Sequence, residues 1–366
     1  MAPDVGNVRG MTVNRFRGPV LPDGEARDLF VVDGHVTYEP VPGAETIAEG
    51  WIVPGLVDAH CHLGLDDHGP VDDQATEEQA ILDRDAGALL IRDCGSAAET
   101  AWIHEREDLP RLVRAGRHIA RTRRYIRNYA HEVEPEDLTA QVVREAQRGD
   151  GWVKLVGDWI SREEGDLAPS FPAAAFAEAI AAAHEHGAKV TAHCFGRDVL
   201  PGLLEAGIDC IEHGTGLSSD LVEMMAARGV ALVPTVMQLE KFPDYAEAGA
   251  EKFPDYAATM ADLFARRRDT VMAAYEAGVS LYAGSDGGGV ARHGNLAGEV
   301  IAMAELGLPA SYALGAASWR GREWLGFDNL TEGASADFVV YDRDPLSDLT
   351  ALLEPRCVVL RGRVVA

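Results

Sequence analysis

Two histidines separated by one residue end an apolar stretch near residue 60. His60 and His62 lie in the stretch 57–62, which ends the apolar run 51–56, and in a β-strand positions i and i+2 point to the same face. The two imidazoles would therefore lie side by side at the carboxyl end of a strand, which is half of a metal site. His184 and His186 have the same spacing, but alanine-rich sequence there is typical of a helix, where such positions face different directions. The surrounding periodicity, and not the spacing alone, indicates the candidate ligands.

Residues that can hold a metal or act as a base also end four other expected strands. They are Lys154, His193, His213 and Asp286. A histidine at one strand end is more often a packed core or rim residue than a ligand. All of these residues together, in chain order, indicate a single site, because the carboxyl ends of the strands in a parallel barrel meet at one mouth.

Lys154 is the most informative of these residues. It lies within the apolar stretch 152–156, and its strand parity places it inside the barrel. Burying an ammonium is costly, and an ammonium has no lone pair for a metal. Both difficulties disappear if the neutral amine takes up carbon dioxide and becomes a carbamate, whose two oxygens can bridge two cations. The alternatives are a lysine that reaches the barrel rim or one that pairs with Asp158.

The elements that must position these residues are short apolar strands that alternate with helices. This alternation predicts βα units and a parallel sheet. The expected strands end near His60, Asp93, Arg121, Val156, His193, His213, Thr235 and Asp286. Eight strands predict a (β/α)8 TIM-like barrel over residues 54–326. The third strand, around 117–121, has only a weak strand pattern in the sequence. Helices are expected over 172–186 and 220–228, each ended by a glycine that favours a left-handed cap.

Both ends of the chain have short alternating strands instead. The stretch 30–38 contains Asp33-Gly34, which favours a tight hairpin because both residues tolerate positive φ. Strands are also expected at 336–342 and 357–365, the latter with a turn at Arg361-Gly362. Residues 1–53 and 327–366 are therefore predicted to form one small β-sandwich domain, composed of both termini.

Composition limits the class of protein. A chain of 366 residues with 47% hydrophobic residues fits one barrel and a small domain. The formal net charge of −26 argues against a nucleic-acid partner and against an anionic membrane surface. Five scattered cysteines, no signal-peptide pattern and no apolar run of roughly 20 residues predict a reduced, cytoplasmic chain.

The sequence resembles the amidohydrolase superfamily, and within it the imidazolonepropionase-like enzymes and the prolidase-like dipeptidases. The motifs that carry the resemblance are residues 55–62, Lys154, residues 191–193, 211–214, 284–286 and 333–340. The resemblance covers nearly the whole chain. It is specific for the fold and the metal chemistry, and much less so for the substrate.

The resemblance implies a binuclear metal site. One ion would be held by His60, His62 and Asp286, the other by His193 and His213, with carbamylated Lys154 as the bridging ligand. A hydroxide shared by the two ions would attack the substrate, and Asp286 would be the catalytic residue that takes up the proton of the water and returns it to the leaving nitrogen. Imidazole and carboxylate ligands suit Zn²⁺, with manganese, iron and cobalt as alternatives.

Substrate contacts are expected from two loops. Arg124, Tyr125, Asn128 and His131 form a polar cluster after the third strand, and His293 lies in the loop after Asp286. The cluster departs from the histidine-glycine loop often seen in the dipeptidase-like relatives, which argues against a peptide substrate.

Other residues near the ligands are expected to have supporting roles. Asp58 and Glu212 are each close to a ligand, but the strand parity of Glu212 predicts that it faces the helical layer. Cys61 is expected to be a buried packing residue. The remaining histidines singled out as surface residues are His104, His118 and His184.

The sequence thus predicts a hydrolase that cleaves a C–N bond in small amides, dipeptides or cyclic amides. The alternatives are a lactone or ester hydrolase with the same site, a dipeptidase specifically, and a non-catalytic protein on the same scaffold, which would usually have lost ligands. The resemblance leaves a homo-oligomer open. An internal repeat, 240–246 and 251–257, is either a lid over the barrel mouth or a surface insertion.

Overall fold

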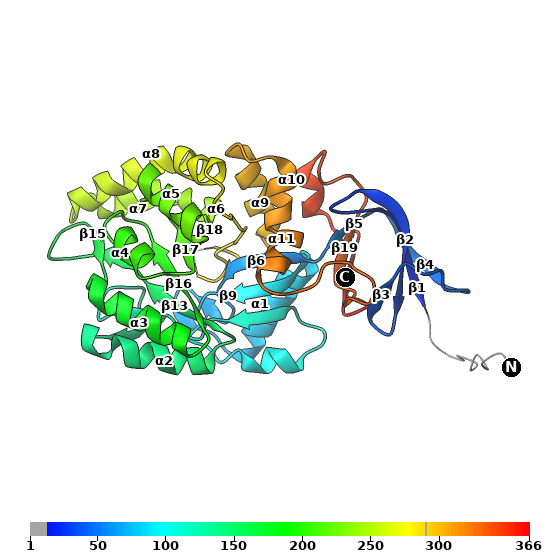
Figure 1. The fold of residues 1–366 in the computed structure, drawn as a ribbon, viewed down its shortest axis with the longest axis horizontal. Helices are drawn as coiled ribbons and strands as arrows, with labels where there is room; N and C mark the ends of the chain where they lie inside the picture. Colours follow the sequence, from blue (N-terminus) through cyan, green and yellow to red (C-terminus); the bar gives the residue numbers. More distant parts are fainter. Residues whose placement is uncertain (1–12, 290) are drawn as a thin grey trace.

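Parallel strands connected by helices form the larger part of the molecule, and a small sheet lies at one end of it (Figure 1). The structure is a computed structural model that describes residues 13–366 except Val290. The part of the expected small domain at residues 1–12 therefore lies outside the described residues.

The parallel strands belong to two sheets, with the orders β10-β9-β6 and β12-β11-β13-β16-β17-β18. Their bounds are β6 (Leu56–Cys61), β9 (Ala88–Asp93), β10 (Arg111–Arg114), β11 (Ile119–Arg121), β12 (His131–Val133), β13 (Trp152–Val156), β16 (Lys189–Cys194), β17 (Cys210–His213) and β18 (Ala231–Val233). In β6 and β13 every residue is buried, which is typical of parallel strands covered on both faces.

The last expected strand, ending at Asp286, forms isolated bridges instead of a regular strand. Leu281 bridges Leu232 of β18, and Gly287 bridges Cys61 of β6. The amide of Asp286 also donates to the carbonyl of His60 at 2.8 Å. This segment, residues 281–287, therefore joins β18 to β6.

On the other side, the described residues form no ladder between β10 and β11. The chain has the α/β arrangement of a TIM-like barrel, and complete closure by eight strands stays a prediction.

Helices cover the outside of these strands (Figure 1). Their bounds are α1 (Asp73–Asp85), α2 (Leu138–Arg148), α3 (Ala173–Glu185), α4 (Leu200–Glu205), α5 (Ser219–Arg228), α6 (Val236–Leu239), α7 (Phe242–Gly249), α8 (Pro254–Glu276), α9 (Leu296–Glu305), α10 (Ala310–Ala316) and α11 (Trp319–Trp324), with 3₁₀ turns at Ala101–Glu105, Pro135–Asp137 and Leu349–Leu353. The two helices predicted with glycine ends are confirmed as α3 and α5. Gly229 has a φ of 67°, its amide donates to the carbonyl of Ala226 and the amide of Val230 donates to the carbonyl of Met225, which is a left-handed cap.

Strands from both ends of the chain form the small sheet (Figure 1). Its order is β21-β20-β19-β5-β1-β2-β3, with β4 paired to β1. The bounds are β1 (Asn14–Val20), β2 (Glu25–Val32), β3 (His35–Thr37), β4 (Glu45–Glu49), β5 (Trp51–Pro54), β19 (Phe338–Tyr341), β20 (Cys357–Leu360) and β21 (Arg363–Val364), and short pairs outside the sheet are β7 (Leu65–Asp66) with β8 (Gly69–Pro70) and β14 (Asp158–Ile160) with β15 (Leu167–Pro169). Strand pairing connects all of these strands of the small domain into one sheet. The predicted sandwich of two sheets therefore stays a prediction.

Both predicted tight turns of the small sheet are confirmed. Asp33 and Gly34 have φ of 51° and 82°, and Arg361 and Gly362 have φ of 48° and 77°. Positive φ at both central residues matches the twist of a two-residue hairpin. The sheet packs around Phe16 and Phe338, whose ring centroids are 4.8 Å apart.

Two further predictions concern the whole chain. All five cysteines are unpaired, which agrees with the predicted reduced chain, and Cys61 is buried as predicted; the other four are buried as well. In the part of the chain that the structure describes, no helix combines the length and the apolar character needed to span a membrane.

Candidate active site

A pocket of about 400 Å³ lies at the carboxyl ends of the parallel strands. The side chains that line its inner end include His60, His62, His193, His213 and Asp286. They come from β6, β16, β17 and the segment 281–287, so the structure brings together five of the six predicted metal ligands. The sixth, Lys154, lies deeper inside, fully buried on β13.

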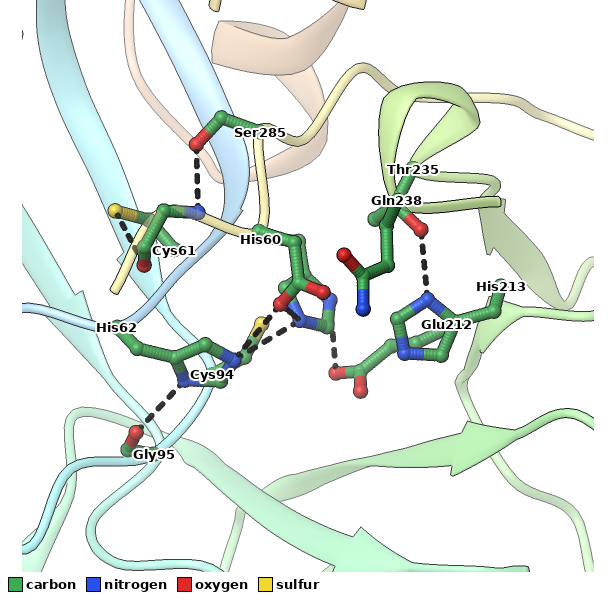
Figure 2. Close-up of polar contacts among 12 residues, drawn as sticks. His60, Cys61, His62, Cys94, Gly95, Glu212, His213, Thr235, Gln238 and Ser285 are labelled. Carbon is green, nitrogen blue, oxygen red and sulfur yellow. Dashed lines mark hydrogen bonds and ion pairs between the residues drawn. The ribbon is translucent and has the colours of Figure 1, made fainter. Parts of the chain in front are cut away.

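The first half of the cluster is formed by His60, His62 and Asp286. The Nε2 atoms of the two imidazoles are 3.1 Å apart, and they lie 2.9 and 3.2 Å from Oδ1 of Asp286. His62 Nδ1 is 2.8 Å from the carbonyl of Gly95 (Figure 2). A carbonyl only accepts, so Nδ1 carries the proton and the Nε2 lone pair points at the cluster.

His213 is oriented in the same way by Thr235 (Figure 2). The Thr235 hydroxyl donates to the carbonyl of Pro234 at 2.8 Å, and its oxygen lies 2.6 Å from His213 Nδ1. Since that hydroxyl proton is already used, His213 Nδ1 must donate to the oxygen. The Nε2 lone pair of His213 is therefore free to bind a cation, as in the outer-shell support of many metal-binding histidines.

Within the ligand cluster, two further imidazole nitrogens are buried without a hydrogen-bond partner among the described residues. They are His193 Nε2 and His60 Nδ1. The His193 ring packs against His213, with centroids 4.7 Å apart, and burial holds the pKa of His193 well below its usual range. A neutral imidazole with an unsatisfied lone pair is suited to a metal, because an unpaired buried polar atom is otherwise costly.

Glu212 corrects one prediction, because it points into the ring of strands and not toward the helical layer. One carboxylate oxygen contacts the Lys154 ammonium, and the other accepts from the Thr191 hydroxyl at 2.8 Å. The parity argument failed at His213, whose φ of 63° reverses the direction of the last side chain of β17. Glu212 and His213 consequently both face the site. Burial alone would raise the pKa of Glu212, but the charge of Lys154 holds this pKa well below its usual range.

Left-handed backbone is concentrated at the strand ends that carry the site. His213, Thr235 and Asp286 have φ of 63°, 46° and 54°. This region is uncommon for residues other than glycine, and such strain is often found at functional sites. In each of the three residues, the positive φ turns the side chain away from the direction that a regular strand would give it.

Asp58 links β6 to the segment that carries Asp286. It accepts from the amide and the hydroxyl of Ser285, at 2.9 and 2.5 Å, and from the amide of His60 at 3.2 Å. Burial raises the pKa of Asp58 to about 7. Asp58 therefore positions the backbone on either side of the ligand cluster and contacts the ligands only through that backbone.

Asp286 is the only predicted catalytic residue. Burial opposes its ionisation, but His60 and His62 hold the pKa of the Asp286 carboxyl well below its usual range. Its side chain is 14% exposed, so the carboxylate faces the pocket while it remains next to both imidazoles. An ionised carboxylate in this position can bind a cation or accept a proton.

The predicted substrate contacts divide into two groups. Tyr125 lines the pocket, whereas Arg124, His131 and His293 do not. The Arg124 guanidinium donates to the backbone carbonyls of β14 and β15, namely Trp159 at 2.7 Å, Ala168 at 2.6 Å and Pro169 at 3.0 Å. His131 is paired with Glu145 at 3.1 Å, and His293 with Asp83 at 2.8 Å, in contact with the buried Cys61. Arg124, His131 and His293 therefore bind other parts of the chain and do not face the pocket.

His118, which was expected on the surface, is fully buried. Its ring stacks on His62 with centroids 4.9 Å apart, and it also contacts Tyr125 and Tyr129. His118 immediately precedes β11. The sequence pattern of this strand is weak, so the side to which the His118 side chain points could not be predicted. His104 and His184 are exposed, as predicted.

Aromatic residues make up much of the pocket wall, and most were not predicted. They are Tyr125, Tyr129, Trp159, Phe195, Tyr245 and Tyr256. Tyr245 and Tyr256 occupy equivalent positions in the internal repeat, at the start of α7 and α8. The repeat was therefore a second sequence signal for this wall, beside the predicted Tyr125, and the structure places its two tyrosines against the pocket.

Comparison with known proteins identifies relatives of the whole chain. Residues 51–365 match the Amidohydrolase family. An uncharacterized protein of Mycobacterium tuberculosis (strain H37Rv) is 53% identical over 349 residues, which are 95% of this chain and 94% of that protein.

Two solved structures have a similar fold. A Xaa-Pro dipeptidase with bound methionine has a TM-score of 0.81 at 21% identity, with 96% of this chain and 99% of that chain covered. A putative prolidase from Bifidobacterium longum has a TM-score of 0.83 at 21% identity, with 97% and 94% covered. The resemblance expected from the sequence motifs is confirmed for the family and the fold.

Proposed function

The chain belongs to the amidohydrolase family and is a hydrolase of carbon–nitrogen bonds, and we propose that it acts on a small amide with the help of two divalent metal ions. The residues proposed to hold the ions are His60, His62, His193, His213, Asp286 and a carbamylated Lys154. Zinc is the first choice because imidazole and carboxylate ligands suit it.

The observation that carries this proposal is the convergence of His60, His62 and Asp286. The two Nε2 atoms are 3.1 Å apart, and the proton of His62 is on its other nitrogen. Two imidazole nitrogens and a carboxylate oxygen at such distances suit a shared cation. The unpartnered His193 Nε2 and the free lone pair of His213 support a second ion nearby.

The proposed carbamate requires a change in the partners of Lys154. As the structure has it, the ammonium pairs with Glu212, and the charges of the two groups balance. A carbamate would instead place a second negative charge beside that carboxylate. The bridge is therefore proposed only for the metal-loaded protein.

The divalent ions would supply a water of lowered pKa and polarise the substrate carbonyl. The chain's own contribution begins with Asp286, whose ionised carboxylate takes up the proton of the attacking water and transfers it to the leaving nitrogen. His62 and His213 are held in one orientation by Gly95 and Thr235. The aromatic wall limits access of bulk water to the reacting atoms.

Metal analysis combined with a hydrolysis screen tests this function. Metal-loaded protein is expected to contain two equivalents per chain and to hydrolyse members of a panel of aryl amides, N-acyl amino acids, hydantoin-like rings and lactones. His193→Asn should lose one equivalent and most turnover, whereas His186→Asn, at an exposed histidine at the end of α3, should lose neither. Full activity with one equivalent would contradict the two-ion site, and cleavage of lactones alone would assign the esterase alternative.

A further inference from the structure

We propose that the substrate of this site is an aromatic amide without a free carboxylate, in contrast to a dipeptide or an N-acyl amino acid. This inference rests on the proposed function, because it assigns a substrate class to the same pocket. Three observations carry it: the aromatic wall next to the ligand cluster, the charge of the pocket lining, and the way in which the nearest arginine is used.

The aromatic wall directly adjoins the histidines that would hold the metal. The Phe195 ring centroid is 4.3 Å from that of His193 and 4.9 Å from that of His213. Trp159 is 5.3 Å from His193 and 4.9 Å from Tyr125. A substrate carbonyl near these histidines would therefore have rings within van der Waals reach, and aromatic groups pair favourably edge to face at such separations.

A further part of the aromatic wall comes from the internal repeat. Tyr245 and Tyr256 line the pocket from α7 and α8, and Gln238 Nε2 donates to the Tyr245 hydroxyl at 2.9 Å. Phe242, in the same repeat, is fully buried against Phe195 at 4.7 Å. The helices that follow β18 thus present two tyrosines to the pocket, and the buried Phe242 anchors these helices against Phe195.

The charged residues of the lining are acidic. Among the described residues, the pocket is lined by Asp286 and Asp67 but by no lysine or arginine. A carboxylate placed against this lining, away from the metal ions proposed at the inner end, loses water without gaining an ionic partner, which is unfavourable. Asp67, exposed at the edge of the pocket, adds repulsion.

Arg124, the cation that the sequence placed closest to the substrate, is already occupied. Its guanidinium is held by the carbonyls of Trp159, Ala168 and Pro169. It therefore supports the β14–β15 pair that carries Trp159 and is not directed at a ligand. Arg292 follows the lining residue Ala291 but is itself exposed and outside the lining.

A matched pair of ligands tests the inference. Acetanilide and 4-acetamidobenzoate share the aryl amide and differ by one carboxylate, and both binding to the metal-loaded protein by calorimetry and release of the arylamine are measured. Acetanilide is expected to bind at least tenfold more tightly. Equal or tighter binding of the carboxylate, or no binding of either compound, would overturn the inference.

The two readouts separate this inference from the proposed function. Selective binding of acetanilide without release of aniline would support the substrate class and contradict the hydrolysis of such amides. Release of 4-aminobenzoate at the higher rate, with tighter binding of its parent, would support a hydrolase and contradict the substrate class.

Two variants sharpen the result. Tyr245→Arg introduces a cation into the wall and is expected to reduce or reverse the preference for acetanilide, and Asp67→Asn should reduce it in part. Asp255→Asn, at an exposed acidic residue in α8 outside the lining, is the matched control and should leave the preference unchanged. A preference unaffected by Tyr245→Arg would count against the charge argument.

Discussion

Lys154 and Glu212 form an ion pair that is completely buried within the ring of strands. The pair lies directly behind the ligand cluster, since the same carboxylate is 3.6 Å from Nδ1 of His60. A buried ion pair is tolerated because each charge compensates the desolvation of the other. Any modification that removes the charge of Lys154 therefore alters the electrostatic balance of the whole site.

This pair predicts that carbamylation of Lys154 depends on bound metal. A carbamate beside Glu212 would leave two adjacent negative charges, which only the cations can offset. Protein supplied with ¹³C-bicarbonate should show a carbamate resonance by NMR when zinc is present and lose it after chelation. Lys154→Ala should lack the resonance, and Lys189→Ala, at an exposed lysine of β16, should keep it. A resonance that persists in the metal-free protein would show that Glu212 does not oppose the modification.

Much of the architecture could be predicted because it follows from local rules. The turns at Asp33 and Arg361 follow from residues that tolerate positive φ, and the end of α5 follows from Gly229. Strand parity also correctly placed Lys154 inside the ring of strands. Each of these depends on one element and its immediate neighbours in sequence.

The features that could not be predicted depend on irregular backbone conformations or on contacts between residues far apart in the sequence. The left-handed φ of His213 reverses its side chain, so parity misplaced Glu212. Arg124 looked like a substrate contact because its carbonyl partners lie more than 30 residues away. The aromatic wall is built largely from loops and from the helices after β18, which have no strand register to read.

Thr235 should control the metal affinity of His213 through its hydroxyl. Thr235→Val keeps the shape but removes the acceptor for His213 Nδ1–H, so the imidazole loses its fixed orientation. We expect zinc affinity, measured by competition with a chelator, to fall by about 10–100-fold. Thr235→Ser retains the hydroxyl and should retain most of the affinity. If both variants bind zinc like the parent, the hydroxyl does not orient this histidine.

His118 should be replaceable by an apolar ring at no cost in stability. Neither of its ring nitrogens has a hydrogen-bond partner among the described residues, and burial holds the pKa of His118 well below its usual range. An unsatisfied buried polar group costs about 1–3 kcal/mol, so His118→Phe should leave the free energy of unfolding of metal-free protein unchanged or raise it. His131→Phe, which removes one of the partners of Glu145, should lower it. A loss of more than about 1 kcal/mol in His118→Phe would indicate an unrecognised partner.

Glu299 should make the metal-free protein less stable as pH rises. It lies buried on α9, accepts from the amides of Val236 and Met237 at 2.7 and 2.9 Å, and burial raises its pKa from 4.5 to about 8. Between these values the folded protein keeps the proton and the unfolded chain releases it, so the free energy of unfolding falls with increasing pH, by up to roughly 1.4 kcal/mol per pH unit. Denaturant unfolding from pH 5 to 8.5 should therefore show a flatter profile for Glu299→Gln, whatever its absolute stability. Glu305→Gln, at the exposed end of the same helix, should follow the parent, and parallel profiles for Glu299→Gln and the parent would show that Glu299 ionises normally.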